Sequence, residues 1–303
     1  MSGKPNYLFL VGAPKCGTSS LARMLGVHPD VVIARNKEPA FFTDFSERDW
    51  TGPGTTGLMR SSIGSREDYE AQFAEQPDAL WRVDASTDYL SCPVSAQRIA
   101  AFRNDPEVGE VRVAVILRDP VGRAISEYQH TIRDRLETKT LKRALELEEG
   151  RLAKGMHPLF GHVFRGSYAS QIARYRAQFD DILILDFHRI REGVKVVNQV
   201  TDYMGLSPVE ARNMASANTS HVYRSSVIHR IIETEIVKNI ARALVPSQFR
   251  DRVRQAINSL NQTSYTPASK ELDMLRSALA DEIAACVADP EIPTDRWTLA
   301  VNK

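Results

Sequence analysis

The chain has 303 residues, and its 39 lysines and arginines almost balance 38 aspartates and glutamates, which leaves a formal net charge of +1. This balance argues against a protein that coats nucleic acid or anionic lipid, because such proteins carry a large basic excess. Hydrophobic residues make up 43% and charged residues 25%, which excludes a disordered or fibrous chain. We therefore expect a globular protein that binds neither nucleic acid nor membranes.

Three widely spaced cysteines, Cys16, Cys92 and Cys286, are too few for a disulfide framework or for a four-cysteine zinc module. Such sparse usage is typical of a reducing compartment. The apolar run YLFLV at 7–11 is too short for a signal peptide, and no later segment reaches the ~18 apolar residues of a membrane-spanning helix. The sequence therefore predicts a cytoplasmic protein that is not exported.

The first predicted elements are typical of the opening of a βαβ unit. The continuous apolar run at 7–11 predicts a strand buried on both faces, which ends at Gly12. After a loop, residues 19–25 carry apolar side chains at helical spacing. Residues 29–34 predict a second short strand, and residues 43–67, rich in Gly, Ser, Thr and Pro, predict an exposed loop.

Strands and helices continue to alternate along the chain. Further strands are predicted at 81–84, 111–117 and 182–186. Helices are predicted at 67–76, 91–102, 121–135, 138–153, 167–179, 193–205 and 226–244, with a loop at 154–166. This order predicts an α/β fold, with a P-loop-like, mostly parallel sheet flanked by helices on both faces and a helical C-terminal portion. A single domain over residues 1–303 is the simplest division, with its ligand beyond the carboxyl ends of the strands.

The segment GAPKCGTSS at 12–20 lies between the first strand and the first helix, where free backbone N–H groups and the helix dipole favour an anion. In a Walker loop a lysine directly follows the second glycine. Here Thr18 follows Gly17, and the lysine comes earlier, at Lys15. The alternative is a tight turn with a serine or threonine cap. The candidate anion-binding residues are Lys15, Cys16, Gly17, Thr18, Ser19 and Ser20.

Two motifs together resemble those of the sulfotransferases that use 3′-phosphoadenosine 5′-phosphosulfate (PAPS). PKCGTSSL at 14–21 looks like the family's 5′-phosphosulfate loop. AVILRDPVGRAISEYQH at 114–130 looks like its 3′-phosphate motif, in which an arginine and a serine bind the nucleotide; those positions are Arg118 and Ser126. The resemblance implies an enzyme with PAPS as cosubstrate and 3′-phosphoadenosine 5′-phosphate (PAP) as product.

KEPAFF at 37–42 is similar to the KE-x-x-FF segment of heparan sulfate and related carbohydrate sulfotransferases, where the glutamate is the general base. The resemblance makes Glu38 the candidate base; the alternative is a solvent-facing glutamate. Ala40 stands where some glycosaminoglycan enzymes have a histidine, and Ala85 stands where their next motif has a lysine. Both departures lie on the acceptor side and weigh against a glycosaminoglycan acceptor. Asp84, in that second motif, is expected to orient the acceptor or the loop lysine.

Later segments extend the resemblance over nearly the whole chain. RGSY at 165–168 matches the family's G-x-Y segment and adds Tyr168 to the nucleotide site. NTSHVYRS at 218–225 resembles a late loop that closes over the nucleotide, with Arg224 at the 3′-phosphate. The seven histidines show no metal-ligand spacing such as H-E-x-x-H, so no metal is predicted. His157 and His162 are expected to be surface residues of the acceptor loop.

These observations combine into the hypothesis of in-line sulfuryl transfer from PAPS to a hydroxyl or amine of a carbohydrate or other small molecule. Glu38 would take the acceptor proton, and Lys15 would neutralise charge on the leaving phosphate oxygen. The alternatives are a P-loop nucleotide kinase or NTPase, and a nucleotide-binding module without catalysis. The near-zero net charge favours a small or neutral acceptor. The acceptor's identity, O- or N-sulfation and the oligomeric state stay open.

Overall fold

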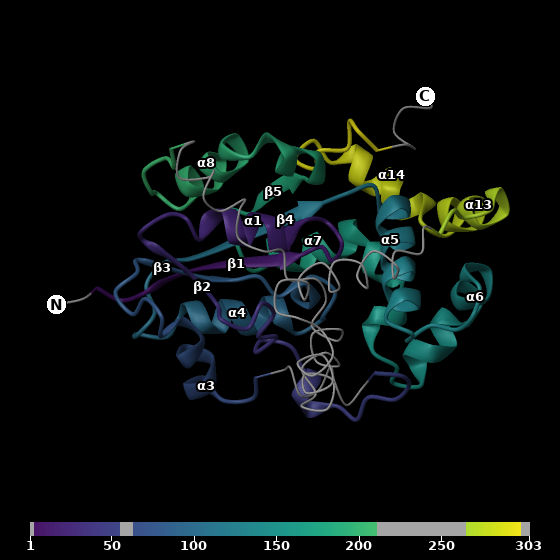
Figure 1. The fold of residues 1–303 in the computed structure, drawn as a ribbon, viewed down its shortest axis with the longest axis horizontal. Helices are drawn as coiled ribbons and strands as arrows, with labels where there is room; N and C mark the ends of the chain where they lie inside the picture. Colours follow the sequence, from purple (N-terminus) through teal and green to yellow (C-terminus); the bar gives the residue numbers. More distant parts are fainter. Residues whose placement is uncertain (1–2, 55–62, 211–264, 298–303) are drawn as a thin grey trace, which may run out of the picture.

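The computed structural model describes residues 3–54, 63–210 and 265–297 (Figure 1). The predicted nucleotide-closing loop at 218–225, with Arg224, and the predicted helix at 226–244 lie outside these residues. The prediction of one domain over residues 1–303 therefore stays a prediction.

Five parallel strands of the described residues form one sheet in the order β2-β3-β1-β4-β5. The strands are β1 (Asn6–Gly12), β2 (Val31–Ile33), β3 (Trp81–Asp84), β4 (Val111–Leu117) and β5 (Leu183–Asp186). Each lies where the sequence predicts a strand, and the parallel pairing confirms the predicted fold class. β1 pairs on both edges, with Leu8 opposite Val83 of β3 and Arg112 of β4. This central position explains why its apolar run is continuous rather than alternating.

Helices cover both faces of the sheet. They are α1 (Thr18–Leu25), α3 (Arg66–Glu70), α4 (Ser95–Arg103), α5 (Pro120–Arg133), α6 (Leu141–Ala153), α7 (Tyr168–Arg176), α8 (Val194–Tyr203), α13 (Ser269–Ala278) and α14 (Ala280–Ala288). α1 and α8 lie above the sheet in the view of Figure 1, and α3 and α4 lie below it. α13 and α14 pack against α5 and α7, so the C-terminal helices lie at the end of the molecule where α5 follows β4.

Some helices are shorter than predicted, for local reasons. α4 begins at Ser95 rather than near residue 91, because Pro93 disfavours a helical conformation of the residue before it. α6 begins after Thr140, whose hydroxyl accepts the N–H of Arg143 at 3.3 Å and caps the helix. The predicted loop at 154–166 contains two short 3₁₀ turns.

An aromatic cluster fixes the segment that contains KEPAFF to the centre of the sheet. The ring centroid of Phe9 in β1 lies 5.2 Å from that of Phe42, edge to face. Phe102 of α4 and Tyr69 of α3 lie 5.0 and 5.4 Å from the Phe42 centroid. All four side chains are buried. Each edge-to-face pair contributes about 0.5–1.5 kcal/mol beyond its buried area, so the cluster holds Phe42 in one place.

The strand order determines where a ligand is expected. The connection after β1 leads to β2 on one side of the sheet, whereas the connection after β4 leads to β5 on the other side. β1 and β4 are neighbours, so their carboxyl ends flank a topological switch point, where α/β sheets bind ligands. Residues 13–17 follow β1 and Arg118 follows β4. Both predicted phosphate-binding segments therefore begin at this point.

Candidate active site

The loop between β1 and α1 presents free backbone donors. Gly17 has φ +88°, a left-handed conformation that glycine adopts without strain, and it leads the chain into α1. No acceptor among the described residues takes the N–H groups of Gly17, Thr18 and Ser19. The N–H groups of Cys16 and Ser20 donate to carbonyls of the loop itself, at 3.2 and 2.9 Å. Three donors therefore remain at the helix start, as an anion site requires.

Cys16 and Tyr168, both predicted to bind the nucleotide, support this loop from inside the protein. Both side chains are fully buried, and the Cys16 Sγ lies 3.8 Å from the Tyr168 hydroxyl. Burial raises the pKa of the Cys16 thiol to about 11, so the thiol is neutral at pH 7 and is a poor nucleophile. Of the three predicted hydroxyl ligands, Ser19 is exposed, Ser20 is half-buried and Thr18 is buried.

Lys15 is a desolvated cation among other cations. Its backbone is left-handed, with φ +67°, and its side chain is partly buried. Burial lowers the pKa of its ammonium, and the positive charges of Arg133 and Lys37 lower it further, whereas Glu127 opposes the shift. The pKa of His130 is also lowered, to about 4, first by burial and then by Lys15. Cations held this close to one another favour a bound anion, which relieves their repulsion.

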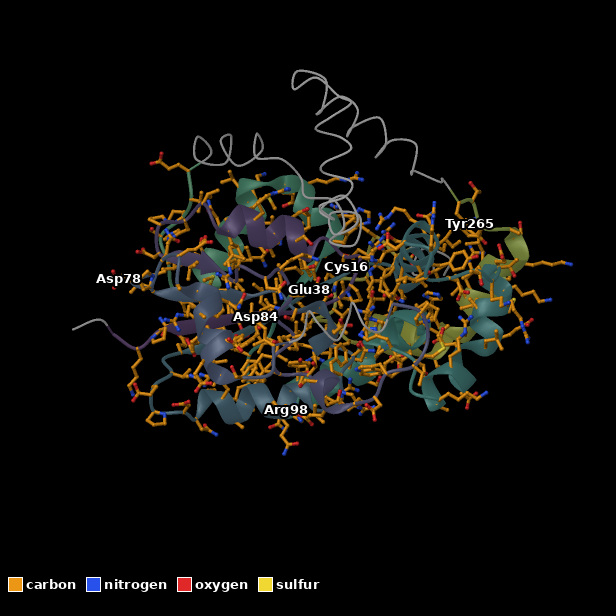
Figure 2. All side chains as sticks on the ribbon, turned by 60° about the horizontal axis from the view of Figure 1, so that its bottom comes forward. Cys16, Glu38, Asp78, Asp84, Arg98 and Tyr265 are labelled. Carbon is orange, nitrogen blue, oxygen red and sulfur yellow. The ribbon has the colours of Figure 1, made fainter. Side chains whose placement is uncertain are left out.

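Glu38 follows β2, and its side chain is 31% exposed. Burial opposes its ionisation, but the Lys37 ammonium, 2.5 Å from Oε1, together with Arg165 and Thr87, holds the carboxyl pKa below its usual range. The Thr87 hydroxyl donates to Oε2 at 3.3 Å. Glu38 is therefore ionised at neutral pH and can accept a proton. Figure 2 shows Glu38, like Cys16, in the central part of the molecule.

Asp84 holds the segment that contains Glu38. Its buried carboxylate accepts the hydroxyls of Ser86 at 2.6 Å and Tyr89 at 2.7 Å. The Ser86 hydroxyl oxygen in turn accepts the N–H of Ala40 at 2.9 Å, where φ is +54°. Burial raises the pKa of Asp84 to about 6, and its hydrogen bonds oppose the rise. Because this carboxylate is fully buried and its hydrogen bonds lead to Ala40, Asp84 supports the segment that contains Glu38. Its expected role in orienting the acceptor or the loop lysine stays a prediction.

The second predicted phosphate site lies at the start of α5. The Arg118 guanidinium lies over the Phe187 ring, 4.9 Å from its centroid. A Cβ on Gly122 would come within 3.4 Å of Arg118 Nε, so the guanidinium lies against this residue. Gly122 and Ser126 are four residues apart on α5 and therefore share one face of the helix. The structure thus brings Arg118 and Ser126 to the same side of α5.

Comparison with known proteins determines the family. Residues 5–229 match the sulfotransferase domain family. The chain belongs to this family. A solved sulfotransferase structure from Alicyclobacillus acidocaldarius is 34% identical, with a TM-score of 0.62, over 76% of this chain and 90% of that one.

Curated relatives of this sulfotransferase family member are more distant. Human heparan sulfate glucosamine 3-O-sulfotransferase 3B1 is 26% identical over 203 residues, which are 66% of this chain and 46% of that protein. Mouse carbohydrate sulfotransferase 15 is 27% identical over 162 residues, which are 40% of this chain and 26% of that protein. The chain thus spans less than half the length of these curated relatives.

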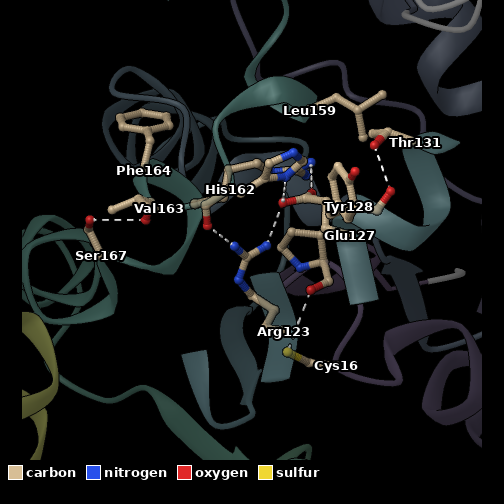
Figure 3. Close-up of polar contacts among 12 residues, drawn as sticks. Cys16, Arg123, Glu127, Tyr128, Thr131, Leu159, His162, Val163, Phe164 and Ser167 are labelled. Carbon is tan, nitrogen blue, oxygen red and sulfur yellow. Dashed lines mark hydrogen bonds and ion pairs between the residues drawn. The ribbon is translucent and has the colours of Figure 1, made fainter. Parts of the chain in front are cut away.

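A buried ionic network, which was not predicted from the sequence, lies next to the candidate site (Figure 3). The Glu127 carboxylate accepts from Arg123 Nη1 at 2.6 Å and from Arg165 Nη1 at 2.5 Å, and the His162 ring lies 3.7 Å away. Arg165 also pairs with Asp88 at 2.6 Å. Although burial opposes ionisation, the two arginines hold the Glu127 pKa far below its usual range. Only the Arg123–Glu127 pair has a local signal, its four-residue spacing on a helix.

His157 and His162 are buried, so the prediction that they lie at the surface is wrong. The His157 ring packs 4.7 Å from the Phe45 ring, and burial lowers its pKa to about 3. Its Nδ1 accepts the N–H of Leu159 at 3.1 Å, which caps a short turn. Within the described ranges, no three His, Cys, Asp or Glu side chains group as metal ligands. No helix in those ranges is both long and apolar enough to cross a membrane.

Proposed function

We propose that the protein transfers the sulfuryl group of PAPS to a hydroxyl or amine of a carbohydrate or other small molecule. The proposal depends on one observation, that the same edge of the sheet carries a loop with unpaired backbone donors and an ionised carboxylate. Lys15 lies in the loop, and Lys37, next to Glu38, is close enough to lower the Lys15 pKa. An anionic donor and an acceptor that must lose a proton need these two kinds of group side by side.

The donor nucleotide would bind across the switch point between β1 and β4. The free N–H groups at the start of α1 would take the 5′-phosphate, because the helix dipole also favours an anion there. Arg118 would take the 3′-phosphate, since a planar guanidinium can donate two parallel hydrogen bonds to it. The proposed donor-binding residues are Lys15, Cys16, Gly17, Thr18, Ser19, Ser20, Arg118, Ser126, Tyr168 and, by resemblance alone, Arg224.

The proposed reaction is an in-line displacement at sulfur. The acceptor atom bonds to sulfur as the bond between sulfur and the 5′-phosphate oxygen breaks, and the acceptor proton passes to a carboxylate oxygen of Glu38. General-base catalysis of this kind contributes about 10²–10⁴-fold to the rate. Lys15 would stabilise the charge that develops on the leaving phosphate oxygen. The donor's own negative charge would raise the lowered pKa of Lys15 and keep its ammonium charged.

Two buried alanines indicate what kind of acceptor the protein takes. By their names, the matched human proteins act on glucosamine in heparan sulfate. Ala40 and Ala85, which replace a histidine and a lysine of the glycosaminoglycan enzymes in the resemblance above, are 8% and 1% exposed. Neither supplies a cation for a sulfated polymer. We therefore propose a small or neutral saccharide, or another small hydroxyl or amine compound, as the acceptor.

Two other functions would also use a phosphate-binding loop. A P-loop kinase or NTPase needs a lysine directly after the second glycine, and Thr18 stands after Gly17 here. A nucleotide-binding module without catalysis needs no ionised carboxylate beside the loop, whereas Glu38 is held ionised by Lys37 and Thr87. Both observations favour sulfuryl transfer.

Glu38→Gln tests the proposal. Transfer from sulfur-35-labelled PAPS is measured with glucosamine, a heparosan oligosaccharide and 4-nitrophenol as acceptors, and PAP binding is measured by calorimetry. The variant should lose about 10²–10⁴-fold in kcat and keep its affinity for PAP. Glu47→Gln is the matched control, because Glu47 also pairs with an arginine but is 58% exposed. Wild-type turnover by Glu38→Gln would remove Glu38 as the base, and binding of ATP with magnesium but not of PAP would favour the kinase.

A further inference from the structure

The Arg165 side chain connects two elements that carry different halves of the site. It is 4% exposed, and its Nη1 lies 2.5 Å from Oε1 of Glu127 while its Nη2 lies 2.6 Å from Oδ1 of Asp88. Glu127 belongs to α5, which follows β4, and Asp88 belongs to the turn Thr87–Tyr89, which follows β3. β1 lies between those two strands in the sheet. One guanidinium therefore spans the carboxyl end of β1, where the phosphate loop begins.

Each end of this bridge adjoins a residue of the proposed site. Glu127 directly follows Ser126, which belongs to the proposed 3′-phosphate site. Asp88 directly follows Thr87, whose hydroxyl donates to Glu38 at 3.3 Å. A shift of the Arg165 bridge would therefore change the position of the carboxylate relative to the nucleotide.

The charges in the network balance, and its ion pairs are short, at 2.5–2.6 Å. Arg123 and Arg165 face Glu127 and Asp88, which gives two positive and two negative charges, and the most exposed of these side chains, Asp88, is 16% exposed. Removing charged side chains from water has a large free-energy cost. The attraction between the charges offsets this cost only where the pairs are close and well oriented. Some proteins retain such buried pairs because they specify one arrangement of the chain. Here the arrangement specified is that of α5 against the turn after β3.

We propose that Arg165 is a positioning residue, which fixes the place and the charge of the general base relative to the donor nucleotide. The inference rests on the proposed function of the site. In the part of the chain that the structure describes, the charged groups that act on Glu38 are Lys37 from its own segment, Asp88 from the turn after β3, and Arg165 from the turn before α7. The Lys37 side chain is 56% exposed, so solvent screens its pairing. Arg165 is buried, and its charge is screened less.

Titration of the Glu38 carboxyl by carbon-13 NMR tests the charge, and loss of the signal in Glu38→Gln assigns it. In Arg165→Met the Glu38 pKa should rise by roughly 0.5–1, because a buried positive neighbour is removed. Arg165→Lys should keep the value near that of wild type, because the charge remains. Arg176→Met is the matched control: Arg176 also bridges two carboxylates, Asp289 and Glu291, but it is 34% exposed. That variant should leave the Glu38 pKa unchanged.

Turnover tests the position. An ammonium cannot donate to both carboxylates in the fork geometry of a guanidinium. Arg165→Lys and Arg165→Met should therefore both lose about 10–100-fold in kcat, because a misplacement of about 1 Å can cost as much as about 100-fold. Transfer is assayed from PAPS to whichever of glucosamine, heparosan oligosaccharide and 4-nitrophenol the wild type sulfates. The affinity for PAP should not change, because Arg123 still pairs with Glu127 and holds the α5 end of the bridge in place. Asp88→Asn, which leaves the Arg165–Glu127 pair in place, should lose kcat in the same way.

An unchanged Glu38 pKa in Arg165→Met, or an equal change in Arg176→Met, would overturn the proposal. Equal losses of kcat and of PAP affinity would also overturn it, because they indicate a damaged fold rather than a displaced base. If Arg165→Met does not fold, the kcat of Asp88→Asn tests the proposal instead. A wild-type kcat in Asp88→Asn would refute the inference. Absence of PAP binding and turnover in the wild type would instead contradict the proposed function, and the titration, which needs no acceptor, would still test Arg165.

Discussion

Replacing Glu127 by glutamine should destabilise the protein strongly, because it leaves a buried guanidinium without its counter-charge. The Glu127 side chain is 1% exposed and accepts from Arg123 at 2.6 Å and Arg165 at 2.5 Å. Two charge-assisted hydrogen bonds contribute about 1.5–3 kcal/mol each, and breaking one partner of a buried pair costs about 3–5 kcal/mol. The glutamine carbonyl can still accept one bond. We therefore expect Glu127→Gln to lower the free energy of unfolding by about 3 kcal/mol.

Equilibrium unfolding in urea, followed by tryptophan fluorescence, measures this loss. The matched control is Glu291→Gln, which removes an ion pair of similar length, 2.6 Å to Arg176, at a carboxylate that is 73% exposed. An exposed pair contributes less than about 1 kcal/mol. The lowered pKa of Glu127 means that its stabilisation is present at neutral pH and is lost as the pH falls below about 4. Equal losses in both variants at pH 7 would refute the reasoning from burial.

Three further predictions concern the proposed donor site and the core. Arg118→Ala should weaken PAP binding in calorimetry at least about tenfold more than binding of adenosine 5′-phosphate, since it removes charged donors; equal losses would contradict the 3′-phosphate assignment. Gly17→Ala should lower the free energy of unfolding by about 1–2 kcal/mol through its positive φ, and it should weaken PAP binding because the new Cβ would lie 3.2 Å from Ile190 Cγ1. Gly205→Ala is the control, because Gly205 has φ +68° and open space around it. It should lower the free energy of unfolding without weakening PAP binding. Equal PAP affinities of the two variants in calorimetry would exclude the contact with Ile190 as a cause. Burial raises the pKa of Asp84 to about 6, so the folded protein binds this proton more tightly than the unfolded chain does. The free energy of unfolding of the wild type therefore falls as the pH rises from about 4 to about 6. Asp84→Asn should remove that loss, which amounts to at most about 3 kcal/mol. Urea unfolding at several pH values measures the difference in free energy of unfolding between the variant and the wild type. A difference that does not vary with pH would show that Asp84 does not titrate in this range.

The sheet could be predicted from the sequence because each buried parallel strand is a short continuous apolar run. The run at 111–117 corresponds to β4 without a shift at either end. The predicted end of the first strand at Gly12 is also confirmed, so the loop of residues 13–17 lies beyond β1 as expected. Helix ends were less predictable, since they depend on single residues such as Pro93, which delays the start of α4 to Ser95.

The ionic network could not be predicted, because its members are distant in sequence and of types that are usually exposed. Arg165 lies 38 residues from Glu127 and 77 residues from Asp88. Charged side chains are almost never fully buried unless they are paired, so a single sequence favours exposed positions for all three. The same reasoning placed His162 at the surface, whereas the network encloses it. Burial of these residues follows from pairing across elements, which appears only once the chain is folded.

The same dependence on tertiary contacts explains how the partly exposed carboxylate of Glu38, the proposed base, is held in one position. Glu38 lies outside any helix or strand, yet Phe42 after it is fixed by the aromatic cluster, and Ala40 is fixed by Ser86. Thr87 holds the carboxylate itself at 3.3 Å. These contacts exist before any substrate binds, so the entropy of orienting the proposed base is lost during folding rather than in the reaction. A flexible glutamate at the same site would have to be ordered in every catalytic cycle, and part of the binding energy of the substrates would be consumed in doing so.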